Sequence, residues 1–251
     1  MDAMLAGKVE ALQGVPVTDH DGNDDEAPVA EGVNAIAAEG DEKEKEVKLL
    51  KHYSSVQSIL TVGDGDFSFS RALATAFGSG DNLVATSLDT YEDLRIKYSK
   101  AESNITELKR MGATVLHGVN AKRMKDHTDL KARRFDRIVF NFPHAGFIGK
   151  EDSVLVIYSH KELVRGFFSN ARHLLRPCGE VHVSHKSGWP YDSWDIEQLA
   201  TESSHAMVEQ VYFQKEDYPG YNNKRGDGSR SDTPFPLGLC YTYKFISSLE
   251  L

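Results

Sequence analysis

Cysteine is scarce in this sequence, with only Cys178 and Cys240 among 251 residues. No Cys-X-X-Cys pair occurs, so we expect neither a disulfide framework nor a metal site, and a reducing intracellular setting is the simpler interpretation. Long apolar runs are also missing, and a membrane-spanning helix needs about 18 or more such residues. The opening MDAMLAGKVEALQG lacks the basic flank and apolar core of a secretory signal.

Basic residues are scarce in the first 50 positions, where four lysines stand against 13 acidic residues. This imbalance accounts for the whole net charge of −9, so the rest of the chain is neutral and neither excludes nor indicates a polyanionic partner. The same 50 residues contain no aromatic side chain and cannot bury enough apolar surface to offset the entropy lost on ordering. We therefore predict a disordered acidic leader over residues 1–50 and one folded domain over residues 51–251.

Beyond residue 56, short apolar segments alternate with helical patterns, which is typical of βαβ units and a parallel sheet. A last pair of strands has no helix between its members and is expected to be antiparallel. The predicted class is thus α/β, with a doubly wound, mostly parallel sheet and an antiparallel C-terminal strand pair. The predicted strands are Ser58–Val62, Leu83–Leu88, Thr114–His117, Asp136–Asn141, Glu180–His185, Ala206–Phe213 and Leu237–Phe245, and the predicted helices are Phe67–Phe77, Tyr91–Met111 and His160–Leu175.

The stretch SILTVGDGDFSFS, residues 58–70, places a glycine-rich turn between the first strand and the first helix. In an open parallel sheet, ligands bind beyond the carboxyl ends of the strands. Gly63 and Gly65 would allow a ligand to approach the backbone closely, while the helix directs its amide groups at it. A plain tight turn with Asp66 as the helix N-cap is the alternative interpretation.

The charge of this turn narrows the choice of ligand. Asp64 and Asp66 would repel a pyrophosphate, and Ser68 stands where a dinucleotide-binding fingerprint has its third glycine. S-adenosylmethionine carries a sulfonium and an ammonium but no phosphate, so we favour it over NAD. Asp89, after the second strand, is placed to bind both ribose hydroxyls, and Asn120, after the third, to read an adenine edge. The predicted cofactor-binding residues are Gly63, Asp64, Gly65, Asp66, Phe67, Ser68, Asp89 and Asn120.

The fourth strand ends in Asn141-Phe142-Pro143-His144, which resembles the Asn-Pro-Pro-aromatic tetrapeptide of amino-methyltransferases. In those enzymes a polar side chain and a main-chain carbonyl hold a base nitrogen, while an aromatic ring stacks on the flipped base. We expect Asn141 and the Pro143 region to orient the base and Phe142 or His144 to pack on it, with His144 or Asp64 taking the proton. A strand ended by proline, with a structural histidine, is the alternative.

Several long motifs together resemble the large-subunit ribosomal RNA uridine-N3 methyltransferase-like family, over roughly residues 53–245. They are YSSVQSILTVGDGDFSFSRALATAFGS, NLVATSLDT, LHGVNA, FDRIVFNFPHAG, ELVRGFFSNARHLL, GEVHVSHKSGWPYDSWDIEQLA and DYPGYNNKRGDG. The resemblance implies a class I Rossmann-like methyltransferase that uses S-adenosylmethionine to methylate N3 of a uridine in ribosomal RNA. The chain departs from the family at Asn120, usually an acid, and at Cys178, usually a glycine. A catalytically inactive module that binds RNA or cofactor, or a methyltransferase acting on another RNA or a small molecule, therefore remains as an alternative.

Contacts with RNA are expected on the same rim of the sheet. Lys186 and Trp189 follow the fifth strand, although Trp189 could instead cover the sheet edge. The long loop over residues 214–236 supplies Tyr221, Lys224 and Arg225, side chains that suit single-stranded RNA. The expected partner is large-subunit ribosomal RNA or a pre-ribosomal particle, bound by a monomer in the nucleolus or cytoplasm.

Overall fold

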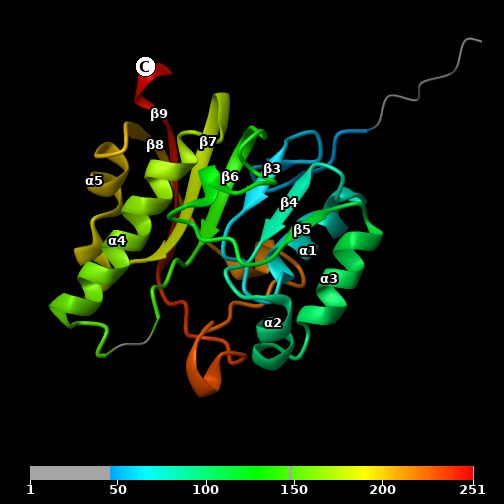
Figure 1. The fold of residues 1–251 in the computed structure, drawn as a ribbon. Coiled ribbons are helices and arrows are strands. Elements are labelled where there is room, and N and C mark those ends of the chain that lie inside the picture. The colour runs from blue at the N-terminus through cyan, green and yellow to red at the C-terminus, as the bar shows by residue number, and fades with distance from the viewer. Residues whose placement is uncertain (1–45, 147–148, 251) are drawn as a thin grey trace, which may run out of the picture. The chain divides into compact units, whose positions relative to one another are not determined.

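The computed structural model describes residues 46–146 and 149–250, so nearly all of the predicted acidic leader lies outside the described residues. A seven-stranded sheet forms the centre, in the order β5-β4-β3-β6-β7-β9-β8 (Figure 1). The pairs from β5 to β7 are parallel, whereas β9 runs antiparallel to both β7 and β8. The predicted class and the antiparallel C-terminal strands are confirmed. The strands are β3 (Ile59–Thr61), β4 (Leu83–Thr86), β5 (Thr114–Leu116), β6 (Phe135–Asn141), β7 (Leu175–Lys186), β8 (His205–Tyr212) and β9 (Cys240–Ser247).

Strand order reverses between β3 and β6, and this reversal fixes where a ligand can bind. The chain proceeds from β3 outward to β4 and β5, then crosses back so that β6 pairs with the other side of β3. The turns that leave β3 and β6 therefore diverge to opposite faces and open a crevice at the carboxyl ends of these strands. The glycine turn follows β3 and Asn141 ends β6, so both predicted motifs border this crevice.

Helices cover both faces of the sheet. One buried cluster joins the sheet to α4 and α5, and a second joins it to α1, α2 and α3 (Figure 1). Phe167 and Phe168 of α4 are fully buried in the first cluster, while Phe69 and Leu73 of α1 lie in the second. The helices are α1 (Ser68–Phe77), α2 (Tyr91–Lys97), α3 (Ala101–Arg110), α4 (Val154–Ala171) and α5 (Ile196–Thr201). No helix in the described ranges combines the length and apolar character needed to cross a membrane.

The helix predicted over Tyr91–Met111 is two helices, α2 and α3. The chain leaves the helical conformation at Tyr98, whose φ is −134° and whose side chain is buried. The Tyr98 hydroxyl donates a hydrogen bond to the Gly226 carbonyl at 3.3 Å, and the ring lies beneath the glycine turn. A tertiary contact with a distant segment thus ends α2, and no local signal in the sequence marks that break.

Two other boundaries differ from the sequence prediction. The helix predicted over His160–Leu175 is α4, which begins at Val154 and ends at Ala171, because Leu175 already belongs to β7. The short α5 was not predicted. The predicted boundary at residue 50 falls inside a small hairpin of β1 (Leu49–Leu50) and β2 (Tyr53–Ser54).

Candidate active site

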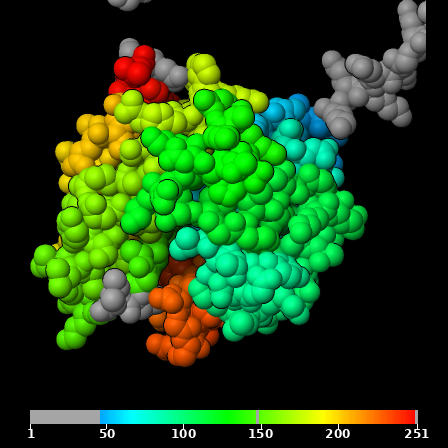
Figure 2. All heavy atoms as spheres, viewed as in Figure 1, coloured from blue at the N-terminus to red at the C-terminus, as the bar shows by residue number. Residues whose placement is uncertain are grey.

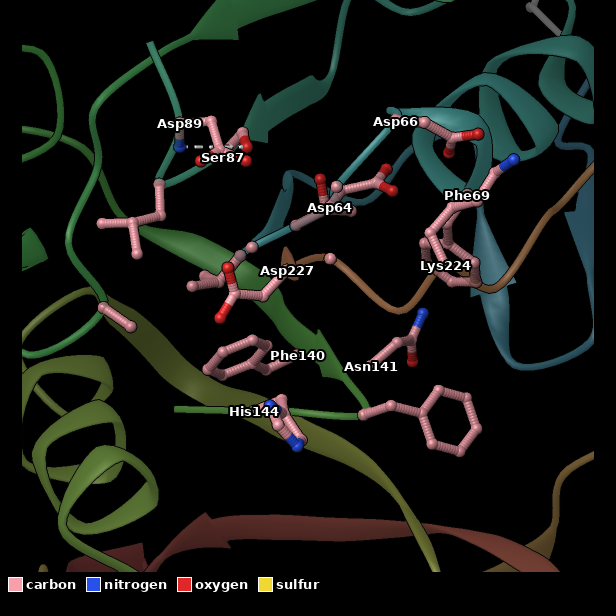
Figure 3. A pocket seen from close by; sticks show the side chains of 18 of the residues that line it. Asp64, Asp66, Phe69, Ser87, Asp89, Phe140, Asn141, His144, Lys224 and Asp227 are labelled. Carbon is pink, nitrogen blue, oxygen red and sulfur yellow. Dashed lines mark hydrogen bonds between the residues drawn. The ribbon is translucent and has the colours of Figure 1, made fainter. Parts of the chain in front are cut away.

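A cavity of about 520 Å³ lies at the carboxyl ends of β3, β4 and β6. The glycine turn, the segments after β4 and β5 and the end of β6 all contribute to it, and Figure 3 shows the side chains around the common space. Of the predicted cofactor-binding residues, the structure brings together Gly63, Asp64, Gly65, Asp66, Asp89 and Asn120 in this lining.

Two predicted cofactor-binding residues do not line the cavity. Phe67 is fully buried and packs edge-to-face against His117 at a centroid distance of 5.7 Å. Ser68 is also buried, and its hydroxyl oxygen accepts a hydrogen bond from the Asn222 backbone N–H at 2.9 Å. Both positions lie where the backbone turns into α1, so their side chains point into the protein. The assignment of these two side chains to the cofactor is corrected accordingly.

Gly63 and Gly65 allow the turn to lie close to neighbouring side chains. Gly63 has φ +62°, and a Cβ there would stand 2.7 Å from Cε2 of Phe140. A Cβ at Gly65 would stand 3.0 Å from the Tyr98 hydroxyl. The turn therefore packs tightly on its protein side and presents its other side to the cavity.

Asp64 holds the start of α1. Its Oδ2 accepts hydrogen bonds from the Ser70 backbone N–H at 2.8 Å and from the Ser70 hydroxyl at 2.6 Å. Burial raises the pKa of this carboxyl to about 7, against the opposing effect of the Ser70 hydrogen bonds. Asp64 is thus engaged by the helix N-terminus in the manner of a capping residue.

Asp66 presents an unsatisfied acceptor to the site. Only 2% of the residue is exposed, and its Oδ1 accepts a hydrogen bond from the Ser68 backbone N–H at 3.0 Å. Its Oδ2 is buried and has no hydrogen-bond partner among the described residues. Burial raises the pKa of Asp66, and the positive charge of Lys224 partly opposes this shift. A buried carboxylate oxygen in this state requires a donor, and a ligand cation could supply it.

Asp89 and Asn120 also line the cavity, and Figure 3 shows Asp89 on the opposite side from Asp66. The Lys97 ammonium on α2 lies 2.5 Å from Asp89 Oδ1, so one carboxylate oxygen of Asp89 already has a cationic partner. Asn120 is exposed, and its Oδ1 accepts a hydrogen bond from the Lys122 backbone N–H at 2.9 Å. The amide group of Asn120 thereby remains a donor toward the cavity.

The end of β6 brings the predicted catalytic tetrapeptide to the edge of the same cavity. Asn141 Oδ1 accepts a hydrogen bond from the Ser184 hydroxyl on β7 at 2.7 Å, which fixes the amide plane. Phe142 has φ +50° and packs edge-to-face against Phe213 and Phe235 at centroid distances of 5.1 and 5.5 Å. Pro143 is buried. Asn141 therefore offers its amide N–H groups, whereas the Phe142 ring is held by other aromatic rings.

His144 belongs to a cluster of histidines around Trp194. Its ring centroid lies 4.4 Å from that of His160, which in turn stacks on Trp194 at 4.3 Å, and His185 lies 4.4 Å from the same indole. Burial lowers the pKa of His144, and lowers those of His160 and His185 to about 4. These imidazoles are therefore neutral at physiological pH.

The residues predicted to contact RNA are placed in different surroundings. Trp189 is 74% exposed on the rim, and Lys186 is half-buried. Lys224 and Arg225 line the cavity, with Lys224 paired to Asp232 at 2.7 Å. Tyr221 also lines the cavity, but it is only 9% exposed and its ring packs against Phe69 at a centroid distance of 5.4 Å, so little of its surface is open to a base.

The segment between β8 and β9, residues 213–239, closes one side of the cavity. Figure 2 shows it in orange beside the teal residues around α2. The Ser231 hydroxyl donates to the Lys97 carbonyl at 3.0 Å, and the Ser99 hydroxyl donates to Asp232 at 2.7 Å. This segment brings Asp227 into the cavity, and β6 brings Phe140 (Figure 3). Sequence reasoning missed both, because no local motif places a C-terminal loop beside the first turn. In the described part of the chain, no group of three or more His, Cys, Asp or Glu side chains could hold a metal ion.

Comparison with known proteins gives a family match that covers most of the domain. Residues 60–225 match the family model described as "rRNA (uridine-N3-)-methyltransferase BTM5-like". The chain is 27% identical over 233 residues to the yeast 25S rRNA (uridine(2634)-N(3))-methyltransferase, covering 72% of this chain and 69% of that protein. Among solved structures, NSun6 from Pyrococcus horikoshii superposes with a TM-score of 0.52 at 15% identity, over 77% of this chain and 48% of that one, which bears on the fold alone.

Two Arabidopsis thaliana proteins are more similar in sequence. Heavy metal-associated isoprenylated plant protein 41 is 56% identical over 196 residues, covering 78% of this chain but only 38% of that protein. The uncharacterized protein At4g26485 is 48% identical over 204 residues, covering 80% of this chain and 98% of its own length. The chain thus corresponds to a little over a third of one plant relative and to nearly all of the other.

Proposed function

Because the chain belongs to the BMT5-like rRNA (uridine-N3-)-methyltransferase family, we propose that it transfers a methyl group from S-adenosylmethionine to N3 of a uridine in large-subunit ribosomal RNA. The yeast relative named for this reaction supports the substrate, and a pre-ribosomal substrate would be met in the nucleolus or cytoplasm. The membership itself supports a methyltransferase fold and activity class.

The observation that carries the proposal is the buried, unpartnered Oδ2 of Asp66 beside the glycine turn. This oxygen would accept a hydrogen bond from the ammonium of S-adenosylmethionine. Asp89 would hold the ribose hydroxyls, and the Asn120 amide would face the adenine edge. No phosphate is needed to fit this acidic cavity, which agrees with the charge of the donor. When bound, the sulfonium supplies an activated methyl group.

The residues at the end of β6 would position the acceptor. Asn141 Oδ1 already accepts a hydrogen bond from the Ser184 hydroxyl. The side of the amide offered to a ligand is therefore its NH₂ group, a donor that suits a uracil carbonyl oxygen. Transfer requires the base nitrogen to lie in line with the methyl group, so a fixed amide contributes through orientation. His144, neutral because burial lowers its pKa, packs at the same edge without placing a second positive charge near the sulfonium.

Incubation of the purified chain with methyl-labelled S-adenosylmethionine and large-subunit ribosomal RNA tests the proposal. We expect label in the RNA, and digestion to nucleosides should yield 3-methyluridine as the labelled product. A folded protein that transfers no label to this RNA, or labels another base, would refute the proposed reaction.

A donor-binding module without turnover is the second candidate, and the departures from the family pattern at Asn120 and Cys178 favour it. Calorimetric titration with S-adenosylmethionine separates the two candidates. Binding accompanied by transfer supports the enzyme, whereas binding without transfer on any RNA supports the module.

A further inference from the structure

A second cavity, of about 180 Å³, adjoins the first near the end of β6. The two cavities share a wall, because five residues line both of them: Phe142, His144, Lys224, Arg225 and Phe235. The remaining lining comes from Pro143, Pro236, the end of β7, the turn that follows it and the segment before α4. We call this smaller cavity the base pocket.

The size and walls of the base pocket suit one planar ring. An engineered protein cavity of about 150 Å³ holds a benzene molecule, so about 180 Å³ is room for a monocyclic base but is small for a purine. Eight of the twelve lining residues are aromatic, imidazoles included, or proline: Phe142, Phe235, Tyr191, Trp194, His144, His185, Pro143 and Pro236. A base flipped out of an RNA strand is typically held between such surfaces and read at its Watson–Crick edge.

One end of the base pocket carries a chain of three polar side chains. The Lys186 ammonium donates a hydrogen bond to the Tyr191 hydroxyl at 3.0 Å and lies 4.3 Å from the centroid of the Tyr191 ring. The Tyr191 hydroxyl in turn donates to Glu151 Oε2. All three residues are half-buried and line the pocket, so a cation, a phenol and a carboxylate face the same small space.

The wall behind this chain is buried and closely packed. Trp194 is 3% exposed and lies between His160 and His185, and His185 Nε2 is 3.1 Å from the Tyr191 carbonyl oxygen. Packing of this kind holds a site in a single geometry. The polar chain is therefore presented from a fixed support, in a pocket that adjoins the proposed donor cavity.

We propose that the base pocket receives a single uracil ring of the RNA substrate, and that Tyr191 and Glu151 together accept the proton released from N3. This inference rests on the proposed function, since it places the acceptor base next to the donor cavity. It adds the pocket, the proton acceptor and the reason for choosing uracil.

The proton balance of the reaction calls for such a chain. Methylation forms a bond between N3 and the methyl carbon, breaks the bond between that carbon and the donor sulfur to leave a neutral thioether, and releases the N3 proton. The Tyr191 oxygen accepts this proton while its own passes to the Glu151 carboxylate, which becomes a neutral acid. Lys186 stays protonated and stabilises the negative charge that develops on the uracil oxygens.

The same chain discriminates between pyrimidines. Uracil presents a carbonyl, an N–H and a second carbonyl along its Watson–Crick edge. A carbonyl can accept a hydrogen bond from the Lys186 ammonium, while the N–H can donate to the Tyr191–Glu151 acceptor. Cytosine has no proton on N3 and carries an amino group in place of one carbonyl, so its ring nitrogen would face the Glu151–Tyr191 acceptor without a hydrogen to share. The resulting unpaired buried groups disfavour cytosine.

Fluorescence of Trp194 tests occupancy of the pocket without any methyl transfer. The Trp189→Phe variant leaves Trp194 as the sole tryptophan in the chain. The fluorescence of this variant is measured while it is titrated with each of two RNAs. One is a short oligocytidine with a single central uridine, and the other is the matched oligocytidine without it. Saturable quenching by the uridine-containing RNA alone supports the pocket, whereas equal quenching by both RNAs, or by neither, overturns it.

Single-turnover methylation of the RNA tests the proton acceptor. Glu151→Gln and Tyr191→Phe should each lower the rate by about 100-fold or more at neutral pH, with donor affinity by calorimetry within about twofold of wild type. The deficit should shrink as the pH rises, because N3 then ionises without help, and a merely structural role would not produce this recovery. The matched control is Glu197→Gln, an exposed carboxylate on α5 that lines neither cavity.

The outcomes separate the two proposals. A wild-type protein that methylates uridine, with both variants equally fast or with a deficit that does not depend on pH, overturns the proton acceptor and leaves the proposed function standing. A wild-type protein that never methylates uridine overturns the proposed function and with it the acceptor, while the fluorescence titration still decides occupancy of the pocket.

Discussion

Substitution of Gly63 by alanine would test whether the turn after β3 depends on glycine in the way the structure indicates. The residue has φ +62°, and an added Cβ would lie 2.7 Å from Cε2 of Phe140. The left-handed conformation costs an L residue about 1–2 kcal/mol, and forcing a methyl group into a packed site costs about 1–3 kcal/mol. We therefore expect Gly63→Ala to lower the free energy of unfolding by about 2–5 kcal/mol, a large share of the roughly 5–15 kcal/mol typical of a domain.

Gly118→Ala provides a matched control for the backbone contribution. Its φ is +69°, close to that of Gly63, but a Cβ there would meet no atom within 4 Å. Only the conformational cost of about 1–2 kcal/mol should remain. Urea unfolding followed by circular dichroism would give both values, and equal m-values would show that the unfolded states are comparable.

A double variant would identify the Phe140 ring as the cause of the difference. Phe140→Leu removes the ring atoms nearest to the new methyl group, so the combined loss of Gly63→Ala and Phe140→Leu should be smaller than the sum of the single losses. A coupling of about 0.5–3 kcal/mol is expected for residues in contact. If Gly63→Ala destabilised the protein no more than Gly118→Ala, or if the two losses were simply additive, the close packing of the turn would be refuted.

Three further perturbations probe the cavity and the core. Asp89→Ala should weaken donor binding by about 10- to 100-fold through lost charge-assisted hydrogen bonds, measured by calorimetry; unchanged affinity would remove Asp89 from the site. Asn141→Ala should lower the single-turnover rate by about 100-fold with little change in donor affinity, and a smaller effect is expected for Ser184→Ala, which only frees the amide. Burial lowers the pKa of His205 to about 4, so the unfolded chain binds a proton that the native state refuses, and stability should fall as the pH drops from about 6.5 toward 4. His160 and His185 act in the same direction, and Asp64, with a raised pKa, acts in the opposite one. His205→Leu should therefore reduce the loss of unfolding free energy at pH 5, measured by urea titration, by roughly 2 kcal/mol or less. An unaltered dependence of this free energy on pH would contradict this account.

Much of the fold was predictable because each strand of the sheet is a short apolar segment bounded by turn residues. The five parallel strands and the last two strands were all found in the sequence, with errors of a few residues at their ends. The break between α2 and α3 was not, because it depends on the buried Tyr98 and its hydrogen bond to Gly226, more than 100 residues away. Information of that kind is tertiary and leaves no local pattern.

The residues of the candidate site likewise fall into those that a local sequence signal identifies and those that depend on tertiary contacts. The prediction included Gly63, Asp66, Asp89 and Asn141 because each lies at the carboxyl end of a strand or in the turn that follows it, and parallel strands bring these ends to one edge. The pairing of Asp89 with Lys97, the capping of α1 by Asp64 and the chain from Lys186 to Glu151 all depend on side-chain directions that periodicity does not give. Tyr221 was predicted to contact RNA because it lies in a loop rich in residues that suit RNA binding. Its ring is buried in the structure, and the sequence gives no sign of this.

The segment over residues 213–239 has a consequence for how the protein matures during translation. Most of the sheet can emerge from the ribosome and begin to pair while this segment is still unsynthesised, since domains form from the N-terminal side as they are made. The glycine turn would then stand open on one side until residues 221–227 arrive from the far end of the sequence. A nascent chain without residues 221–227 would thus leave the proposed donor cavity unclosed on that side, so competence to retain a donor would arise after translation of this segment and not with the turn itself.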